Sequence, residues 1–152
     1  MATVGGSVVV AAPLADTWDH YFEARGWPAW VDGFTAVEAN EGYPEAGGNL
    51  RWRSTPAGRG TVSERVLEHE PRSRHRVAFN DPQSQGELTT TFAIEPGGEA
   101  VATRVTQELE YSLRSGGPFA RVADRLFIRS QVRGSLERSL VRFKHEVEDR
   151  PA

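Results

Sequence analysis

The chain has 152 residues, of which 26% are charged, and its formal net charge is −3. This length suits one domain, and we expect a single domain over residues 1–152, ordered from about residue 3 to residue 148. The small net charge excludes the overall basic field that would attract nucleic acid or an acidic membrane. The lack of cysteine excludes disulfides, thiolate metal sites and cysteine nucleophiles.

No stretch approaches the roughly 18 apolar residues that a membrane-spanning helix needs. The first residues, MATVGGS, have neither the basic nor the apolar region of a secretion signal. These features predict a cytoplasmic protein with no integral membrane contact.

The N-terminal part predicts a strand followed by two short helices. Residues 7–11 form a β-branched run that ends before Pro13, whose fixed φ suits the first position of a helix. Leu14, Trp18 and Phe22 are spaced four residues apart, as on one face of a helix. A second helical turn is expected at 27–30, where two tryptophans can pack against the core.

The middle of the chain, 34–111, alternates short β-rich runs with turn residues, as in an antiparallel meander. We place strands near 34–40, 48–54, 60–69, 74–80, 87–95 and 100–112. Proline and glycine clusters separate them. Gly97-Gly98, between Ile94 and Val101, is the strongest hairpin signal.

From Pro118 to about Glu148 the chain has no internal proline and contains helix formers throughout, which predicts one long helix. About 30 residues at 1.5 Å each give roughly 45 Å, enough to cross a sheet of six or seven strands. The expected apolar stripe consists of Phe119, Val122, Leu126, Leu136, Leu140, Phe143 and Val147. Arg129 and Arg133 are expected inside it.

The order of these elements resembles the START-like, or SRPBCC, superfamily, which includes the birch-pollen-allergen fold and small bacterial polyketide cyclase/dehydrase proteins. The segments that carry the resemblance are Val8–Pro13 with Trp18, Trp27–Trp30, Gly47–Leu50 and Val66–Pro71. The resemblance implies an α+β helix-grip fold. In this fold a curved antiparallel sheet of six to seven strands wraps around the C-terminal helix, and a cavity lies between them.

Strand alternation predicts which polar side chains face this cavity. Thr90 shares its face with Leu88, Phe92 and Ile94, Glu64 with Val62 and Val66, and His75 with Val77 and Phe79. Gln107 and Tyr111 likewise accompany Val105 and Leu109, and Trp52 accompanies Leu50. Burying such groups without partners costs about 1 to 3 kcal/mol each, so they need partners, water or a ligand.

Two arginines in the helix stripe allow two interpretations. Arg129 or Arg133 can close the core as an ion pair with Glu64 or extend along the helix edge. Alternatively, their donor forks face an anionic or enolate oxygen of a ligand.

The sequence lacks a glycine-rich phosphate loop, a His-Glu-x-x-His motif and a Gly-x-Ser-x-Gly motif. The four histidines, at 20, 69, 75 and 145, show no metal-binding spacing. We therefore predict neither a metal nor another cofactor.

We expect a monomer or weak homodimer that binds a small apolar or amphipathic molecule, such as a lipid, an isoprenoid or an aromatic metabolite. The expected ligand-binding residues are Arg129, Arg133, Trp52, Trp30, Thr90, Phe92, Gln107 and Tyr111. One alternative is a polyketide cyclase or aromatase that folds its substrate, with His75, Glu64 or Tyr111 exchanging protons. Another is a protein-interaction module, although the outer sheet face is polar.

Overall fold

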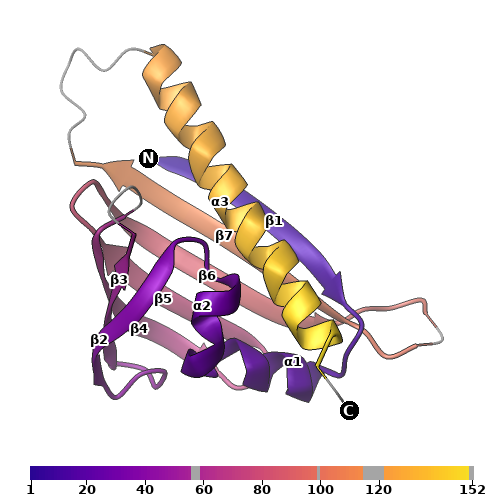
Figure 1. The fold of residues 1–152 in the computed structure, drawn as a ribbon. Coiled ribbons are helices and arrows are strands. Elements are labelled where there is room, and N and C mark those ends of the chain that lie inside the picture. The colour runs from indigo at the N-terminus through magenta and orange to yellow at the C-terminus, as the bar shows by residue number, and fades with distance from the viewer. Residues whose placement is uncertain (56–58, 99, 115–121, 151–152) are drawn as a thin grey trace.

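The computed structural model describes residues 1–55, 59–98, 100–114 and 122–150. They form a seven-stranded antiparallel sheet, two short α-helices and one long α-helix (Figure 1). The strands are β1 (Ala2–Val10), β2 (Phe34–Glu41), β3 (Asn49–Ser54), β4 (Thr61–Glu70), β5 (Arg74–Asn80), β6 (Ser84–Ile94) and β7 (Thr103–Leu113). The helices are α1 (Leu14–Tyr21), the 3-10 turn η1 (Ala24–Gly26), α2 (Trp27–Trp30) and α3 (Val122–Glu148).

The strands follow the spatial order β1-β7-β6-β5-β4-β3-β2, so β1 lies beside the last strand and β2 forms the other edge. Strands β2 to β7 are a meander of consecutive antiparallel neighbours, as the turn signals predicted. Irregular pairing between β2 and β3, and between β4 and β5, introduces bulges that bend the strands. Helix α3 crosses one face of the sheet along β1, and α1 and α2 lie at one end of that face (Figure 1). This arrangement is the expected helix-grip fold.

Strand β1 starts at Ala2, five residues earlier than the expected start at Ser7, and it ends at Val10. The missed part contains Gly5 and Gly6, which weaken any prediction of a strand. At Gly6 an added Cβ would lie 3.0 Å from Leu136 and 3.3 Å from Leu140. The glycine therefore allows α3 to pack closely on β1.

The region of β6, β7 and the hairpin between them agrees with the predictions only in part. The hairpin at Gly97-Gly98 is confirmed, with φ of +92° at Gly97. Strand β6 starts three residues before the expected position, at Ser84, and β7 starts at Thr103 instead of 100. Ile94 is 69% exposed and does not join the inner face, because it ends β6 at the projecting hairpin.

Both tryptophans of α2, Trp27 and Trp30, are buried, as predicted. Trp27 also donates its indole Nε1–H to the carbonyl of Tyr21 at 2.8 Å, which fixes α2 against the end of α1. Trp18 is buried on α1, and Leu14 and Phe22 are partly buried.

The apolar stripe of α3 is correct in its C-terminal half, where Leu136, Leu140, Phe143 and Val147 are all buried. In the N-terminal half the prediction for Leu126 was wrong, because Leu126 is 61% exposed and Ile128 and Val132 pack against the core in its place. The predicted helix start at 118 lies outside the described residues, as do Phe119 and the side chain of Val122.

The arginines at 129 and 133 are exposed and do not lie inside the apolar stripe, which agrees with the alternative in which they extend along the helix edge. Arg129 follows Ile128 and Arg133 follows Val132 along the chain. One residue rotates a side chain by about 100° around the helix, so both arginines point away from the face that packs on the core. Arg129 reaches the edge of the sheet and donates to the carbonyl of Thr3 at 3.1 Å.

Candidate functional site

A cavity of about 570 Å³ lies between the inner face of the sheet, α2 and α3. This volume falls within the range of small-molecule sites. Its aromatic lining consists of Tyr21, Trp27, Trp30, Phe34, Tyr43, Trp52, Phe79 and Tyr111. Its aliphatic lining includes Leu50, Val77, Leu88, Leu109, Leu113, Ile128, Val132 and Leu136. Most of the wall is therefore apolar, and the polar side chains are gathered in a few places.

A carboxyl group from β4 faces this cavity. Glu64 pairs with Leu50 across β3 and β4, and its Oε2 accepts the indole Nε1–H of Trp52 at 2.6 Å. Burial raises the pKa of the Glu64 carboxyl, although the hydrogen bond from Trp52 and the charge of Arg59 partly oppose this shift. Glu64 is thus a weakly acidic group at the cavity wall.

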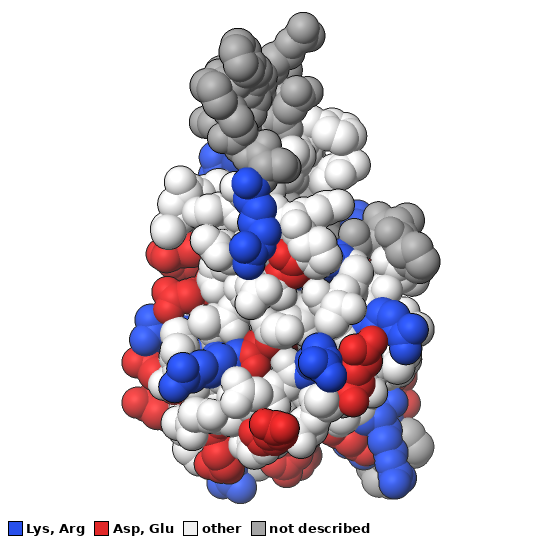
Figure 2. Space-filling view, turned by 90° about the vertical axis from the view of Figure 1, so that its left-hand side faces the viewer, with Lys and Arg blue, Asp and Glu red and all other residues white. Residues whose placement is uncertain are grey.

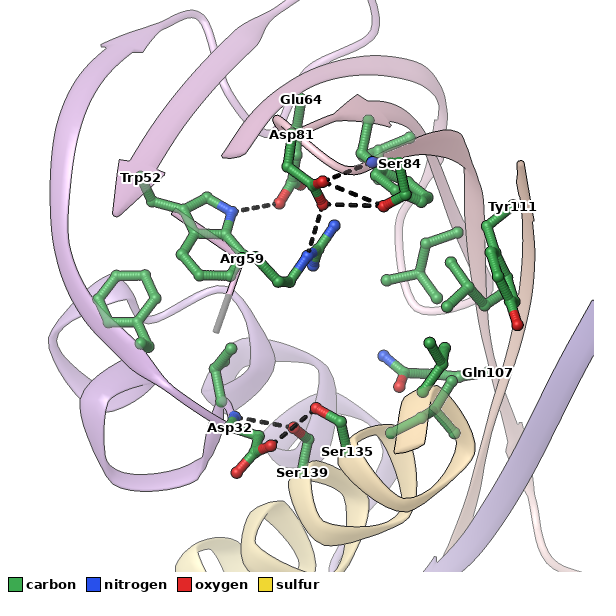
Figure 3. Close-up of a pocket in the computed structure, with 18 of the residues that line it drawn as sticks. Asp32, Trp52, Arg59, Glu64, Asp81, Ser84, Gln107, Tyr111, Ser135 and Ser139 are labelled. Carbon is green, nitrogen blue, oxygen red and sulfur yellow. Dashed lines mark hydrogen bonds and ion pairs between the residues drawn. The ribbon is translucent and has the colours of Figure 1, made fainter. Parts of the chain in front are cut away.

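Next to this carboxyl, an ion pair joins the turn before β4 to the turn after β5. Arg59 donates from Nε to Oδ2 of Asp81 at 3.0 Å, and the Asp81 side chain is only 1% exposed. The guanidinium carbon lies 4.9 Å from the ring centre of Phe79 and 5.5 Å from that of Trp52. These contacts hold the cation at the cavity wall (Figure 3).

On the opposite side of the open space, Asp32 connects the end of α2 to α3 (Figure 3). Its Oδ2 accepts from Ser135 Oγ at 2.7 Å and from Arg138 at 3.1 Å, and its Oδ1 accepts from Arg142 at 3.1 Å. Burial alone would raise the pKa of Asp32. The hydrogen bonds and charges of its partners outweigh burial and hold this pKa below its usual value.

The floor of the cavity contains a buried polar cluster. Tyr21 Oη lies 3.0 Å from Thr90 Oγ1, and Gln107 Nε2 donates to both, at 3.1 Å and 3.2 Å. Burial raises the pKa of Tyr21 to about 12, so its hydroxyl keeps its proton at neutral pH. This cluster satisfies polar groups that strand alternation predicted to face inward.

A pair of histidines lies at the end of the inner sheet face where α1 packs. His75 Nδ1 is 3.0 Å from His69 Nδ1, and His75 Nε2 is buried with no hydrogen-bond partner among the described residues. Burial, together with the neighbouring His69, lowers the pKa of His75 to about 3. His75 is therefore neutral at physiological pH.

Most of the predicted site residues line the cavity. Those predicted from strand alternation are Glu64, His75, Tyr111, Trp52, Thr90 and Gln107, and Trp30 joins them from α2. Phe92 has the predicted inward orientation but does not line the cavity, because it packs against the rings of Trp18 and Tyr21. Arg129 and Arg133 also lie outside the lining, and Glu64 forms its described hydrogen bond with Trp52 rather than with either arginine.

Sequence reasoning missed Arg59, Asp81, Asp32 and Tyr43, all of which line the cavity. Asp81 carried a usable signal, because an aspartate before proline often accepts hydrogen bonds from backbone amides in the following turn. It accepts those of Gln83 at 2.9 Å and Ser84 at 2.8 Å. Arg59 and Asp32 lie in loops, where no periodicity indicates the direction of a side chain.

The side of the molecule that carries β2 and β3 shows basic and acidic side chains interspersed around an uncharged central area (Figure 2). Within the described ranges, no three histidine, aspartate or glutamate side chains are grouped so as to hold a metal ion. Among the described helices, none has the length and apolar character needed to cross a membrane.

The family model described as "Polyketide cyclase / dehydrase and lipid transport" matches residues 1–148. Similar solved structures include TTHA0849 from Thermus thermophilus, with a TM-score of 0.72, 20% identity and coverage of 96% of this chain and 97% of that one. Protein MLL2253 from Mesorhizobium loti has a TM-score of 0.70, 17% identity and 99% coverage of both chains.

The di-domain ARO/CYC BexL from the BE-7585A biosynthetic pathway is also similar, with a TM-score of 0.69 and 19% identity. The match covers 99% of this chain and 51% of BexL. No curated protein matches the sequence. The structural similarities establish the fold, and the family match spans nearly the whole chain. The protein therefore belongs to the polyketide cyclase/dehydrase and lipid transport family.

Proposed function

We propose that the protein binds a small, largely apolar molecule, such as an aromatic metabolite, an isoprenoid or a lipid, in the cavity between the sheet and α3. The observation that carries this proposal is the cavity of about 570 Å³ with its mostly aromatic and aliphatic wall. Membership of a family described by polyketide cyclases and lipid transport supports it.

The energetics favour a ligand with both apolar and polar parts. A molecule that buries about 300 Å² of apolar surface gains about 7 kcal/mol from desolvation. The loss of translational and rotational freedom offsets about 4 kcal/mol or more of this gain. Polar contacts at Glu64, Arg59 or Gln107 therefore have a large influence on affinity and orientation.

Native mass spectrometry of the purified protein, followed by organic extraction, tests the proposal. A thermal-shift panel of fatty acids, isoprenoids, flavonoids and aromatic polyketides completes the test. Val132→Trp places an indole in the cavity, since Val132 lines it. Val141→Trp is the matched control on the same helix, because Val141 is 46% exposed.

We expect a co-purified molecule or a ligand-dependent rise in Tm that Val132→Trp abolishes and Val141→Trp preserves. Equal shifts in both variants would place binding outside the cavity and contradict the proposal.

A second candidate function is cyclisation of a poly-β-ketone by substrate folding and proton transfer. The observation in its favour is a carboxyl with a raised pKa, Glu64, at the wall of an apolar cavity. In this reaction the cavity brings a methylene and a carbonyl of one chain together. Glu64 as carboxylate accepts the methylene proton, the enolate carbon attacks the carbonyl carbon, and the resulting alkoxide takes that proton back from the Glu64 carboxyl, which returns to the carboxylate. His75 and Tyr111 are further candidates for proton exchange.

Product analysis by mass spectrometry with a cyclisable poly-β-ketone distinguishes carrier from cyclase. A cyclase should accelerate formation of the ring product, and Glu64→Gln should retain binding but lose this acceleration. Binding without any acceleration would favour the carrier.

A further inference from the structure

We propose that the cavity selects ligands with a carboxylate end, which binds between the guanidinium of Arg59 and the carboxyl of Glu64. This inference rests on the proposed binding function and specifies the chemical class and the orientation of the ligand. It is based on four charged side chains at the cavity wall, those of Arg59, Glu64, Asp81 and Asp32.

Arg59 supplies the cationic group. Its Nε is engaged by Asp81, and its two Nη groups have no hydrogen-bond or ion-pair partner among the described residues. The aromatic rings of Trp52 and Phe79 lie against the guanidinium and restrict its position. A carboxylate can accept two parallel hydrogen bonds from such a planar group.

Asp81 does not prevent this interaction. Its Oδ1 accepts the backbone N–H groups of Gln83 and Ser84, and both of its oxygens contact Ser84 Oγ, at 3.1 Å and 3.0 Å. With Arg59 Nε added, the Asp81 carboxylate has several donors of its own. It therefore anchors one side of the guanidinium and leaves the Nη groups available.

Arg138, the other arginine in the cavity lining, already has a hydrogen-bond partner. Arg138 donates to Asp32 at 3.1 Å, on the other side of the open space. Asp32 carries a negative charge there, because its partners keep its pKa below the usual value. Because Asp32 already occupies Arg138 and Arg142, the charged donors that a ligand carboxylate meets in the cavity without a partner among the described residues are the Nη groups of Arg59, across the open space from Asp32 (Figure 3). This difference fixes the orientation of the ligand.

Glu64 completes the site as a proton donor. Trp52 occupies its Oε2, and Oε1 has no hydrogen-bond partner among the described residues. Burial raises the pKa of Glu64, and a ligand anion beside it would raise this pKa further. The protonated carboxyl can then donate to the ligand, as in a carboxyl–carboxylate pair.

The titratable groups around Glu64 come from several elements. Arg59, Tyr21 and Tyr43 interact electrostatically with its carboxyl, and Asp81 and His75 line the same cavity. Burial raises the pKa values of both tyrosines and lowers that of His75, so these three groups are neutral near pH 7. The proton linked to binding is therefore assigned to Glu64.

Fluorescence titration with anthracene-2-carboxylate and its neutral analogue anthracene-2-carboxamide tests the inference. We expect the native protein to bind the carboxylate at least tenfold more tightly. Arg59→Met keeps an apolar side chain beside the rings and should abolish this preference, whereas Arg59→Lys should retain part of it. Arg51→Met is the matched control, since Arg51 is exposed and pairs with Glu38 outside the cavity.

Calorimetry in buffers of different ionisation enthalpy measures the number of protons taken up when the ligand binds. Binding of the carboxylate should be accompanied by proton uptake in the native protein, and Glu64→Gln should remove that uptake. Equal affinity of the native protein for both probes would overturn the inference and leave the binding function in place. A preference that survives in Arg59→Met would also overturn it. If neither probe binds and no ligand is found in the extraction, both proposals are overturned.

Discussion

Trp52 and Glu64 join neighbouring strands through a hydrogen bond of 2.6 Å from the indole Nε1–H to the carboxyl Oε2. Trp52 pairs with Val62 and Glu64 with Leu50, so the two side chains are diagonal neighbours on the inner face of the sheet. The bond satisfies one oxygen of a carboxyl that is costly to bury alone. It also leaves the other oxygen available to a molecule in the cavity.

The free energy of unfolding of Glu64→Gln should rise relative to that of the native protein as pH rises. Because burial raises the pKa of Glu64 above its ordinary 4.5, the native state binds more protons than the unfolded state above that pH. The native protein therefore loses stability as pH rises from 4.5 through the folded pKa. A difference of one pH unit between the folded and unfolded pKa values corresponds to about 1.4 kcal/mol. Glutamine keeps an acceptor for Trp52 but does not ionise.

Urea unfolding at pH 4, 6 and 8, followed by tryptophan fluorescence, measures this difference. Glu41→Gln serves as the control, because Glu41 is exposed at the end of β2. A stability difference between Glu64→Gln and native protein that stays constant with pH would contradict the assignment.

Asp32→Asn should lower the free energy of unfolding at pH 7 by about 1 to 2 kcal/mol, because charged hydrogen bonds to Ser135 and Arg138 are weakened. The pKa of Asp32 is held below its ordinary value of 3.8, so its contribution is present above pH 3.8 and is lost as pH falls through the folded pKa. Denaturation at pH 7 and pH 2.5 checks both statements. Asp19→Asn, at an exposed position of α1, should have little effect at either pH.

The inner face of the sheet could be predicted because strand alternation has a period of two. Once Val62 and Val66 identified the inner face of β4, Glu64 followed without any knowledge of its neighbours. The same reasoning failed on α3, where an error of one residue rotates a side chain by about 100°. Arg129 and Arg133 were therefore expected in the cavity, whereas Ile128 and Val132 occupy its wall.

The charged part of the site was not predictable in the same way. Arg59 and Asp81 belong to two different turns, and Asp32 follows α2. Their directions depend on how the turns fold and on which elements meet across the cavity. An aspartate before proline is typical of a turn, but the interaction of Asp81 with Arg59 depends on the three-dimensional arrangement of β3, β4 and β5.

His75 should remain neutral across physiological pH. Burial and His69 lower its pKa to about 3, compared with an ordinary value of 6.5. The unfolded state binds the additional proton between these values, so stability should decrease as pH falls from 6.5 to 3. NMR of the imidazole nitrogens should show one neutral form of His75 from pH 5 to pH 8. The exposed His145 provides the internal control. Titration of His75 near pH 6.5 would contradict this prediction.

Gly86→Ala should destabilise the protein by about 1 to 3 kcal/mol or more, because β6 and β7 approach too closely for a side chain at this position. An added Cβ would lie 1.8 Å from the carbonyl oxygen of Glu110, so the strands must separate. Gly86 pairs with Tyr111, a cavity-lining residue, and the separation should therefore also weaken ligand binding.

Gly98→Ala is the matched control, since among the described residues its added Cβ would meet only Ala100, at 3.6 Å or more, in the hairpin beyond the cavity. Chemical denaturation and amide hydrogen exchange should show lower protection of β6 and β7 in Gly86→Ala alone. If the two variants were equally stable, β6 and β7 would have to tolerate a side chain at position 86.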